Sequence, residues 1–168
     1  LGLHILSGVL LLFGAMQIYF DTGDMSIRAL ELGNPGVLLV FLAFGIKAGF
    51  PFLHTWIADA YPKATVVGTV ILSAFTTKLA IYALARTFAG EQSLVWIGAI
   101  MTIYPVFFAV VENDLRKVLS FSLNNQLGFM VCAIGVGTPL ALNGAAAHAF
   151  CHIMYKSLLF MSMGAVLY

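Results

Sequence analysis

The chain has 168 residues, of which 61% are hydrophobic and 9% are charged, and its mean hydropathy is +1.00. Soluble domains carry about 25% charged residues, so this composition excludes a soluble domain and indicates an integral membrane protein in contact with the lipid bilayer. The net charge of +1 argues against nucleic acid as a partner, because nucleic-acid binding requires clusters of Lys and Arg.

Six apolar segments approach the length of roughly 20 residues that a helix needs to cross the hydrocarbon core. In chain order they are Leu3 to Phe20, Val37 to Ala60, Thr65 to Phe88, Leu94 to Val111, Val118 to Gly137 and Leu140 to Leu167. Lipid cannot satisfy open backbone groups, so helices are expected. The sequence predicts an all-α integral membrane protein, with residues 1–168 forming a single transmembrane domain fragment that continues at both ends in a longer protein.

Prolines interrupt two of these segments. Pro51 in the second segment and Pro105 in the fourth each remove a backbone donor and clash with the preceding turn, so a kink or a break is expected at both. Lys47 comes one turn before Pro51, and His54 follows closely after it. Interrupted helices beside ionisable residues are typical of secondary transporters. We therefore interpret Pro51 and His54 as part of a functional broken helix, and Pro105 as a packing feature.

The charged linkers predict an orientation. Lys63, Arg116 and Lys117 follow the second and fourth apolar segments, whereas Arg28 and Arg86 follow the first and third. By the positive-inside rule, the linkers with the larger number of basic residues are cytoplasmic.

Three lysines, Lys47, Lys78 and Lys156, lie inside apolar segments that have no Asp or Glu in their middle. Holding an ammonium at membrane depth costs roughly 2.5 to 3.5 kcal/mol, and such residues typically mark ion or proton pathways. The alternative is that the long side chains extend to the membrane interface. If they stay buried, these lysines can exchange protons near neutral pH.

The last segment adds His148 and His152, spaced so that each precedes the next ionisable residue by four positions and the series ends at Lys156. Steps of four return to nearly the same helix face, which predicts a polar stripe about 12 Å tall. Imidazole both donates and accepts protons, so the stripe is suited to a proton relay. Two alternatives remain: structural histidines, or a zinc site that would make the chain a membrane metalloenzyme.

The fifth segment carries a run of polar side chains: Ser120, Ser122, Asn124, Asn125 and Gln126. Such residues either tie a helix to its neighbours by hydrogen bonds or hold water beside the histidine stripe. No dinucleotide-binding glycine pattern, P-loop or CxxC pair occurs, so no cofactor is predicted, and we expect no metal.

Several of these motifs, in their order along the chain, resemble those of one family. They are KAGFPFLHTWIADA at 47–60, Thr77-Lys78, DLRKVLS at 114–120 and HAFCHIMYKSLLF at 148–160. The resemblance is to the proton-translocating antiporter-like subunits of NADH:quinone oxidoreductase (complex I), of membrane hydrogenases and of Mrp-type cation/proton antiporters. It implies a fold of roughly fourteen helices with two inverted repeats, each containing a broken helix. This chain would supply the end of the first repeat, about 1–90, and the start of the second, about 91–168.

The resemblance also implies residue roles. Lys47 matches the lysine of the first broken helix, whose usual partner is a glutamate on an earlier helix. Lys78 matches the central lysine that passes protons between two half-channels. His148, His152 and Lys156 match the polar stripe that enters the second half-channel.

The implied function is proton and ion translocation within a multisubunit Na⁺/proton antiporter, D-like and of the Mrp type. A component of complex I or of a membrane hydrogenase is the alternative, and a non-conducting scaffold subunit is a third possibility. The implied partners are other membrane subunits, protons and Na⁺, and the implied location is the bacterial inner membrane. The chain would have no catalytic site of its own.

Overall fold

A computed structural model describes residues 2–24 and 26–166 of the chain. The elements are α1 (Gly2–Thr22), α2 (Pro35–Ala48), α3 (Thr55–Lys63), α4 (Val66–Ile71), a π-helical turn η1 (Leu72–Thr76), α5 (Thr77–Thr87), α6 (Gln92–Val111), α7 (Leu115–Val136) and α8 (Pro139–Val166). No strand occurs in the described ranges, and the prediction of an all-α membrane protein is confirmed.

Five of the predicted segments form helices that are long and apolar enough to cross a membrane: α1, the continuous α4–η1–α5, α6, α7 and α8. The second predicted segment is divided between α2 and α3. The break considered at Pro105 does not occur, because α6 runs through this residue without interruption. In the turn that the proline disrupts, the carbonyl of Thr102 accepts a hydrogen bond from the side chain of Asn125 on α7. The carbonyl that loses its usual donor at Pro105 is that of Met101, so the bond from Asn125 lies at the next residue and ties α7 to this turn of α6.

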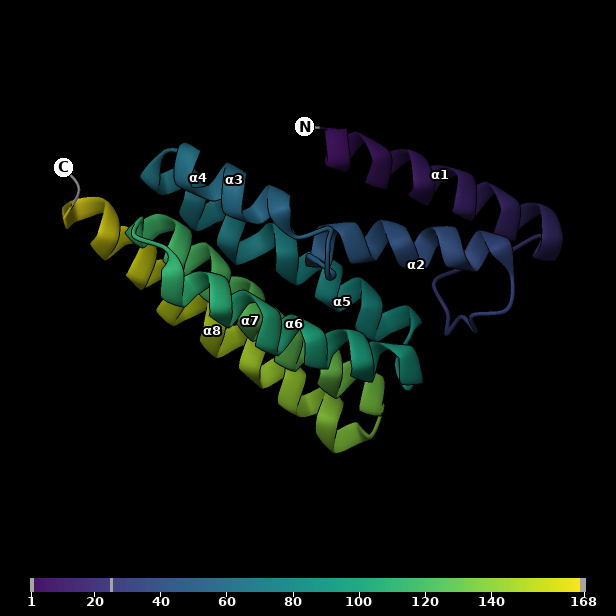
Figure 1. The fold of residues 1–168 in the computed structure, drawn as a ribbon. Helices are drawn as coiled ribbons and strands as arrows, with labels where there is room; N and C mark the ends of the chain where they lie inside the picture. The colour runs from purple at the N-terminus through teal and green to yellow at the C-terminus, as the bar shows by residue number, and fades with distance from the viewer. Residues whose placement is uncertain (1, 25, 167–168) are drawn as a thin grey trace.

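The helices pack along one another in a layered bundle (Figure 1). α1 lies beside α2, and α7 contacts both α6 and α8. The backbones of α6 and α7 approach at small residues: a Cβ added to Gly128 would lie 2.7 Å from the backbone nitrogen of Thr102. Small residues allow such close approach between membrane helices. α8 also contacts η1 and α4, which brings its polar stripe toward α5.

The linkers gather at two opposite ends of the bundle. The guanidinium of Arg116, in the first turn of α7, donates to the carbonyl of Ala64 at 2.8 Å and to Thr69 Oγ1 at 3.1 Å, so the linker after α3 and the start of α4 meet the start of α7. At the other end of the 22-residue α4–η1–α5 helix, the Leu30 N–H donates to the Thr87 carbonyl at 2.7 Å. The linkers predicted to be cytoplasmic therefore lie at one end of the bundle, and those predicted to lie on the opposite side of the membrane are at the other end. Which end is cytoplasmic stays a prediction.

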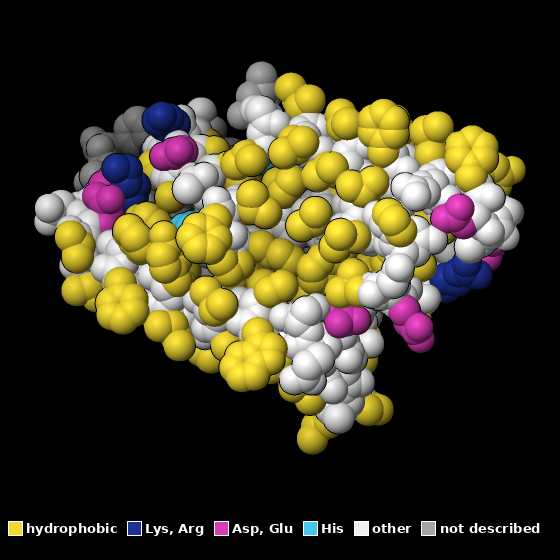
Figure 2. Space-filling model, turned by 45° about the vertical axis from the view of Figure 1, so that its right-hand side comes forward, with side chains coloured by type: hydrophobic (Ala, Val, Ile, Leu, Met, Phe, Trp, Pro, Cys, Tyr) yellow, Lys and Arg dark blue, Asp and Glu magenta, His cyan; other side chains and the backbone are white. Residues whose placement is uncertain are grey.

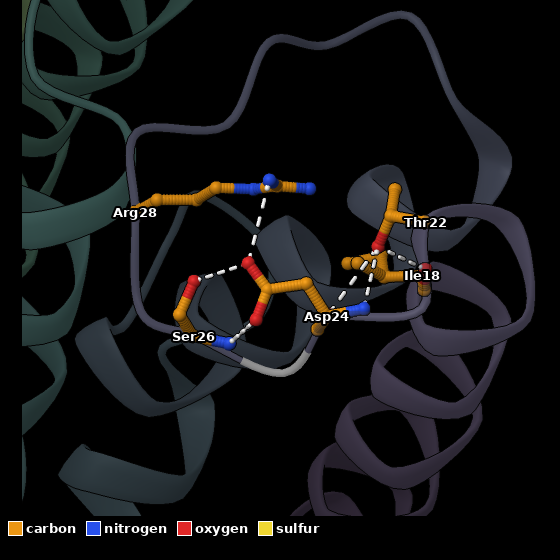
Figure 3. Close-up of polar contacts among 5 residues, drawn as sticks. All are labelled: Ile18, Thr22, Asp24, Ser26 and Arg28. Carbon is orange, nitrogen blue, oxygen red and sulfur yellow. Dashed lines mark hydrogen bonds and ion pairs between the residues drawn. The ribbon is translucent and has the colours of Figure 1, made fainter.

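The long linker after α1 is held by short-range polar contacts (Figure 3). The Asp24 carboxylate accepts hydrogen bonds from the backbone N–H and the hydroxyl of Ser26, at 2.9 and 2.6 Å, and forms a 3.6 Å ion pair with Arg28. At the end of α1, the Thr22 hydroxyl donates to the Ile18 carbonyl at 2.7 Å. Exposed ion pairs contribute at most about 1 kcal/mol, so these contacts shape the linker more than they stabilise the fold.

The surface supports a membrane location. Figure 2 shows hydrophobic side chains across the middle of one face, with Lys, Arg, Asp and Glu gathered toward its left and right ends. Among the exposed hydrophobic residues are Phe13, Leu79, Trp96, Phe107 and Leu158. Large apolar surfaces of this kind are stable in lipid and not in water.

Candidate functional site

The broken helix predicted around Pro51 is present. α2 and α3 are separated by residues 49–54, where Gly49 (φ 81°) and Phe52 (φ 67°) both have left-handed backbone. Glycine adopts this conformation readily, but in a phenylalanine it costs on the order of 1–3 kcal/mol. A Cβ on Gly49 would lie 2.5 Å from Asn124 Oδ1, so α7 packs closely against the break.

A hydrogen bond and a ring contact hold the residues that follow the break. Trp56 Nε1 donates to the carbonyl of Ile46 at 2.8 Å and so ties the start of α3 back to the last turn of α2. The predicted His54 is buried, and its ring packs edge-on against Tyr104 of α6 with the ring centroids 5.1 Å apart. Its Nδ1 has no hydrogen-bond partner among the described residues.

Lys47 lies half-buried in the last turn of α2, and its Nζ is 2.5 Å from Nδ1 of His4 on α1. In the described part of the chain no Asp or Glu forms an ion pair with this ammonium. Sequence reasoning missed His4. The residue stands alone near the start of an apolar segment, and only the packing of α1 against α2 brings it to Lys47.

Lys78 is buried, with 8% of its surface exposed, beside the π-helical turn η1. Its Nζ donates to the Ser73 carbonyl at 2.8 Å and approaches Thr77 Oγ1 at 3.4 Å. Hydrogen bonds in a π-turn run to the fifth residue instead of the fourth, so a carbonyl of the turn loses its usual donor. The lysine ammonium supplies a donor to this turn.

The polar stripe on α8 has the geometry that the spacing predicted. The rings of His148 and His152 are stacked with centroids 6.1 Å apart. His152 is 0% exposed, and neither of its ring nitrogens has a hydrogen-bond partner among the described residues. Lys156 is 1% exposed, and its Nζ donates to Ser122 Oγ of α7 at 2.9 Å. Both Lys78 and Lys156 are thus buried within the protein.

The structure brings Lys78 together with the α8 stripe. Lys78 lines a hollow together with Ala145, Ala146 and Ala149 of α8, the helix that carries His148, His152 and Lys156. This hollow of about 410 Å³ lies between α5, α7 and α8, and a second of about 340 Å³ is lined by Ala145 and His148. Hollows of this size that present ionisable groups have room for several water molecules.

Lys47 lies in a separate place. It lines a hollow of about 400 Å³ between α1, α2 and the η1–α5 helix, together with His4, Thr76 and Ala80. Lys78 lines a hollow on another side of α5. The η1–α5 helix therefore stands between the broken helix and the α8 stripe, and residues of this helix line both hollows.

The zinc site considered at His148 and His152 would have few ligands. Within the described residues, no group of three or more His, Cys, Asp or Glu side chains is close enough together to hold a metal ion. A stable protein site for zinc uses three or four such ligands. The pair His148 and His152 would supply two.

Comparisons with known proteins agree with this architecture. The family model described as NADH:quinone oxidoreductase/Mrp antiporter, TM, matches residues 2–168. Among similar curated proteins, the D-type Na(+)/H(+) antiporter subunit of Alkalihalophilus pseudofirmus is 30% identical over 97% of this chain and 37% of its own length. Hydrogenase-4 component B of Escherichia coli is 29% identical over 95% and 28%, and chloroplastic NAD(P)H-quinone oxidoreductase subunit 5 of Adiantum capillus-veneris is 32% identical over 94% and 24%.

Solved structures show the same fold. A chain in the structure of the Mrp complex from a Dietzia species superposes with a TM-score of 0.91 at 29% identity, over 98% of this chain and 34% of that one. The chain thus spans between 24% and 37% of the length of these proteins. The family resemblance found in the sequence is confirmed. The chain is an integral membrane protein that belongs to the transmembrane family of NADH:quinone oxidoreductase and Mrp antiporter subunits.

Proposed function

We propose that this chain is part of a proton- and ion-translocating subunit of a multisubunit Na⁺/proton antiporter of the Mrp type. Two similar proteins, from Alkalihalophilus pseudofirmus and Bacillus subtilis, are named as D-type subunits of Na(+)/H(+) antiporters. The Mrp complex is also a close structural neighbour at 29% identity. The partners would be further membrane subunits, protons and Na⁺, and the location would be the bacterial inner membrane.

A proton-pumping subunit of a quinone oxidoreductase or a membrane hydrogenase is the second candidate. The observation that favours it is that the relatives from Adiantum capillus-veneris and Escherichia coli match this chain at nearly the same identity. Proton flux that follows a Na⁺ gradient in membrane vesicles, without NADH or quinone, distinguishes the antiporter from this candidate.

One observation carries the proposed relay: two buried ammonium groups, on Lys78 and Lys156, have no acidic partner among the described residues. Lys156 lies one helical turn from His152, a buried imidazole without a hydrogen-bond partner in the same residues. A buried ammonium is energetically costly, so its presence in a membrane-spanning segment indicates a function. The relay would pass a proton from Lys78 through water to His148 and His152, and on to Lys156. Repulsion between the groups favours occupation by one proton at a time.

The broken helix would form the other part of this pathway. Lys47 would exchange a proton with Lys78 across the η1–α5 helix, through water beside Thr76 and Thr77. In the proposed arrangement, residues about 1–90 end the first inverted repeat and residues about 91–168 begin the second. Each half would then contribute one set of titratable groups.

The proposal is tested by Lys78→Met in the intact complex. Methionine has a similar length and flexibility but no ammonium, so assembly should be retained while Na⁺-coupled proton flux falls at least about 100-fold, the lower end of the range for loss of a proton-transfer group. The matched control is Lys117→Met, which removes a partly exposed lysine in the first turn of α7 that forms a 3.7 Å ion pair with Glu112. Flux of the Lys78→Met complex equal to that of the control would favour the scaffold alternative and overturn the relay.

A further inference from the structure

His4 is held between the two arms of the broken helix. Its Nδ1 is 2.5 Å from Nζ of Lys47, in the last turn of α2. Its ring also packs edge-on against Trp56, near the start of α3, with the centroids 4.4 Å apart and an interplanar angle of 72°. One imidazole on α1 therefore contacts the residues on both sides of the break.

The indole that supports His4 is itself fixed. Trp56 is 7% exposed, and its Nε1–H donates to the Ile46 carbonyl at 2.8 Å. Edge-on packing of two aromatic rings is favourable and restricts the orientation of the imidazole. The imidazole is thus positioned for transfer along its short contact with Lys47.

His4 also lines two separate hollows. One, of about 400 Å³, contains Lys47, Ser7 and Thr76. The other, of about 510 Å³, is lined by Thr55, Trp56, Asp59 and Lys63, at the end of the bundle where α3 joins α4. Asp59 and Lys63 are exposed and charged, so water is favoured in the second hollow.

We propose that His4 exchanges protons between Lys47 and water in the hollow beside Asp59 and Lys63; this inference rests on the proposed function of Lys47. In the neutral ring with hydrogen on Nε2, Nδ1 accepts a hydrogen bond from the Lys47 ammonium. The Nζ–H bond breaks as the Nδ1–H bond forms, which leaves a neutral amine and an imidazolium. The Nε2–H bond then breaks as a water molecule takes that proton, and the reverse steps reload Lys47.

The charged groups that face His4 from the neighbouring helices are consistent with this direction of exchange. Lys47 approaches from α2, and the hollow presents Asp59 and Lys63 from α3. The carboxylate provides an acceptor beside the water, and the two α3 charges offset one another. Imidazole suits this position because it accepts at one nitrogen and donates at the other.

The test separates proton exchange from hydrogen bonding. His4→Gln retains an acceptor for Lys47 but cannot carry a proton, so Na⁺-coupled proton flux by the intact complex should fall at least about tenfold between about pH 6 and about pH 9. His4→Ala should lose flux similarly, and imidazole added to the buffer should restore at least half of it by entering the space left by the ring. Ile5→Ala, at an exposed residue next to His4 on α1 that lines neither hollow, should retain wild-type flux.

Lys47→Ala distinguishes a failure of this inference from a failure of the proposed function. It should abolish flux, and imidazole should not restore it. Normal flux in Lys47→Ala would overturn both. If Lys47→Ala is inactive and His4→Gln transports like wild type at every pH, only the role of His4 is overturned. A second outcome would also overturn the role of His4: flux is lost in His4→Gln, and imidazole does not restore flux in an assembled His4→Ala complex. His4 would then act only through structure.

Discussion

Replacing Lys156 by methionine should separate stability from transport. The ammonium is 1% exposed and has one hydrogen bond, to Ser122, among the described residues. Holding the charge at membrane depth costs roughly 2.5–3.5 kcal/mol, whereas a hydrogen bond to a charged group returns roughly 1.5–3 kcal/mol. Methionine fills nearly the same volume without either contribution. Lys156→Met should therefore leave the free energy of unfolding unchanged or raise it by about 1–2 kcal/mol.

Two measurements on the purified complex check this expectation: thermal unfolding in detergent and Na⁺-coupled proton flux after reconstitution. Flux should be lost in Lys156→Met while the unfolding temperature stays level or rises. The contrasting variant is Ser122→Ala, which leaves the ammonium buried without its partner and should destabilise the protein by about 1–3 kcal/mol. A loss of more than about 2 kcal/mol in Lys156→Met would refute the reasoning, because the ammonium would then be needed for folding.

Variants of His152, Lys47 and Gly128 test other parts of the chain. His152→Gln should slow proton flux as much as His152→Ala, and flux equal to wild type between about pH 6 and about pH 9 would remove this ring from the pathway. Lys47→Ala should abolish transport and Lys47→Arg should restore only part of it, since arginine does not readily release a proton; full activity in either, measured in vesicles at equal expression, speaks against the relay. Gly128→Ala should lower stability by about 1–3 kcal/mol, because its Cβ would meet the Thr102 backbone nitrogen at 2.7 Å, whereas Gly144→Ala, with nothing within 4 Å, should show no such loss in thermal unfolding.

The sequence was sufficient to predict the membrane class, the positions of the apolar segments and the break at Pro51. These features follow from composition and backbone chemistry: helices are the default in lipid, and proline beside glycine interrupts them. The alignment of His148, His152 and Lys156 on one face was also predictable, because it depends only on the helical repeat. These are local properties, and they survive whatever the neighbouring helices do.

Features that depend on how helices meet were not predictable. The contact of His4 with Lys47 joins residues 43 positions apart and requires the rotation of α1 against α2. The bond from Lys156 to Ser122 spans 34 positions and requires the seating of α8 on α7. The bond from Asn125 to the Thr102 carbonyl likewise requires the packing of α7 against α6. A single chain without alignment gives the pattern of each helix but not its angle of rotation.

The break between α2 and α3 also has an electrostatic consequence for Lys47. A helix carries a partial negative charge of about half an elementary charge at its C-terminal end, and here that end lies inside the membrane-spanning part of the chain, beside the ammonium. In an unbroken helix the dipole would end in the solvated headgroup region and would be screened. Ending it at Gly49 places a fixed partial charge beside Lys47 that favours its charged form by about 0.3–1 kcal/mol, and by up to about 2 kcal/mol where water is excluded. Unlike a carboxylate, this partial charge cannot be protonated. It therefore stabilises the ammonium without competing with Lys47 for the transferred proton.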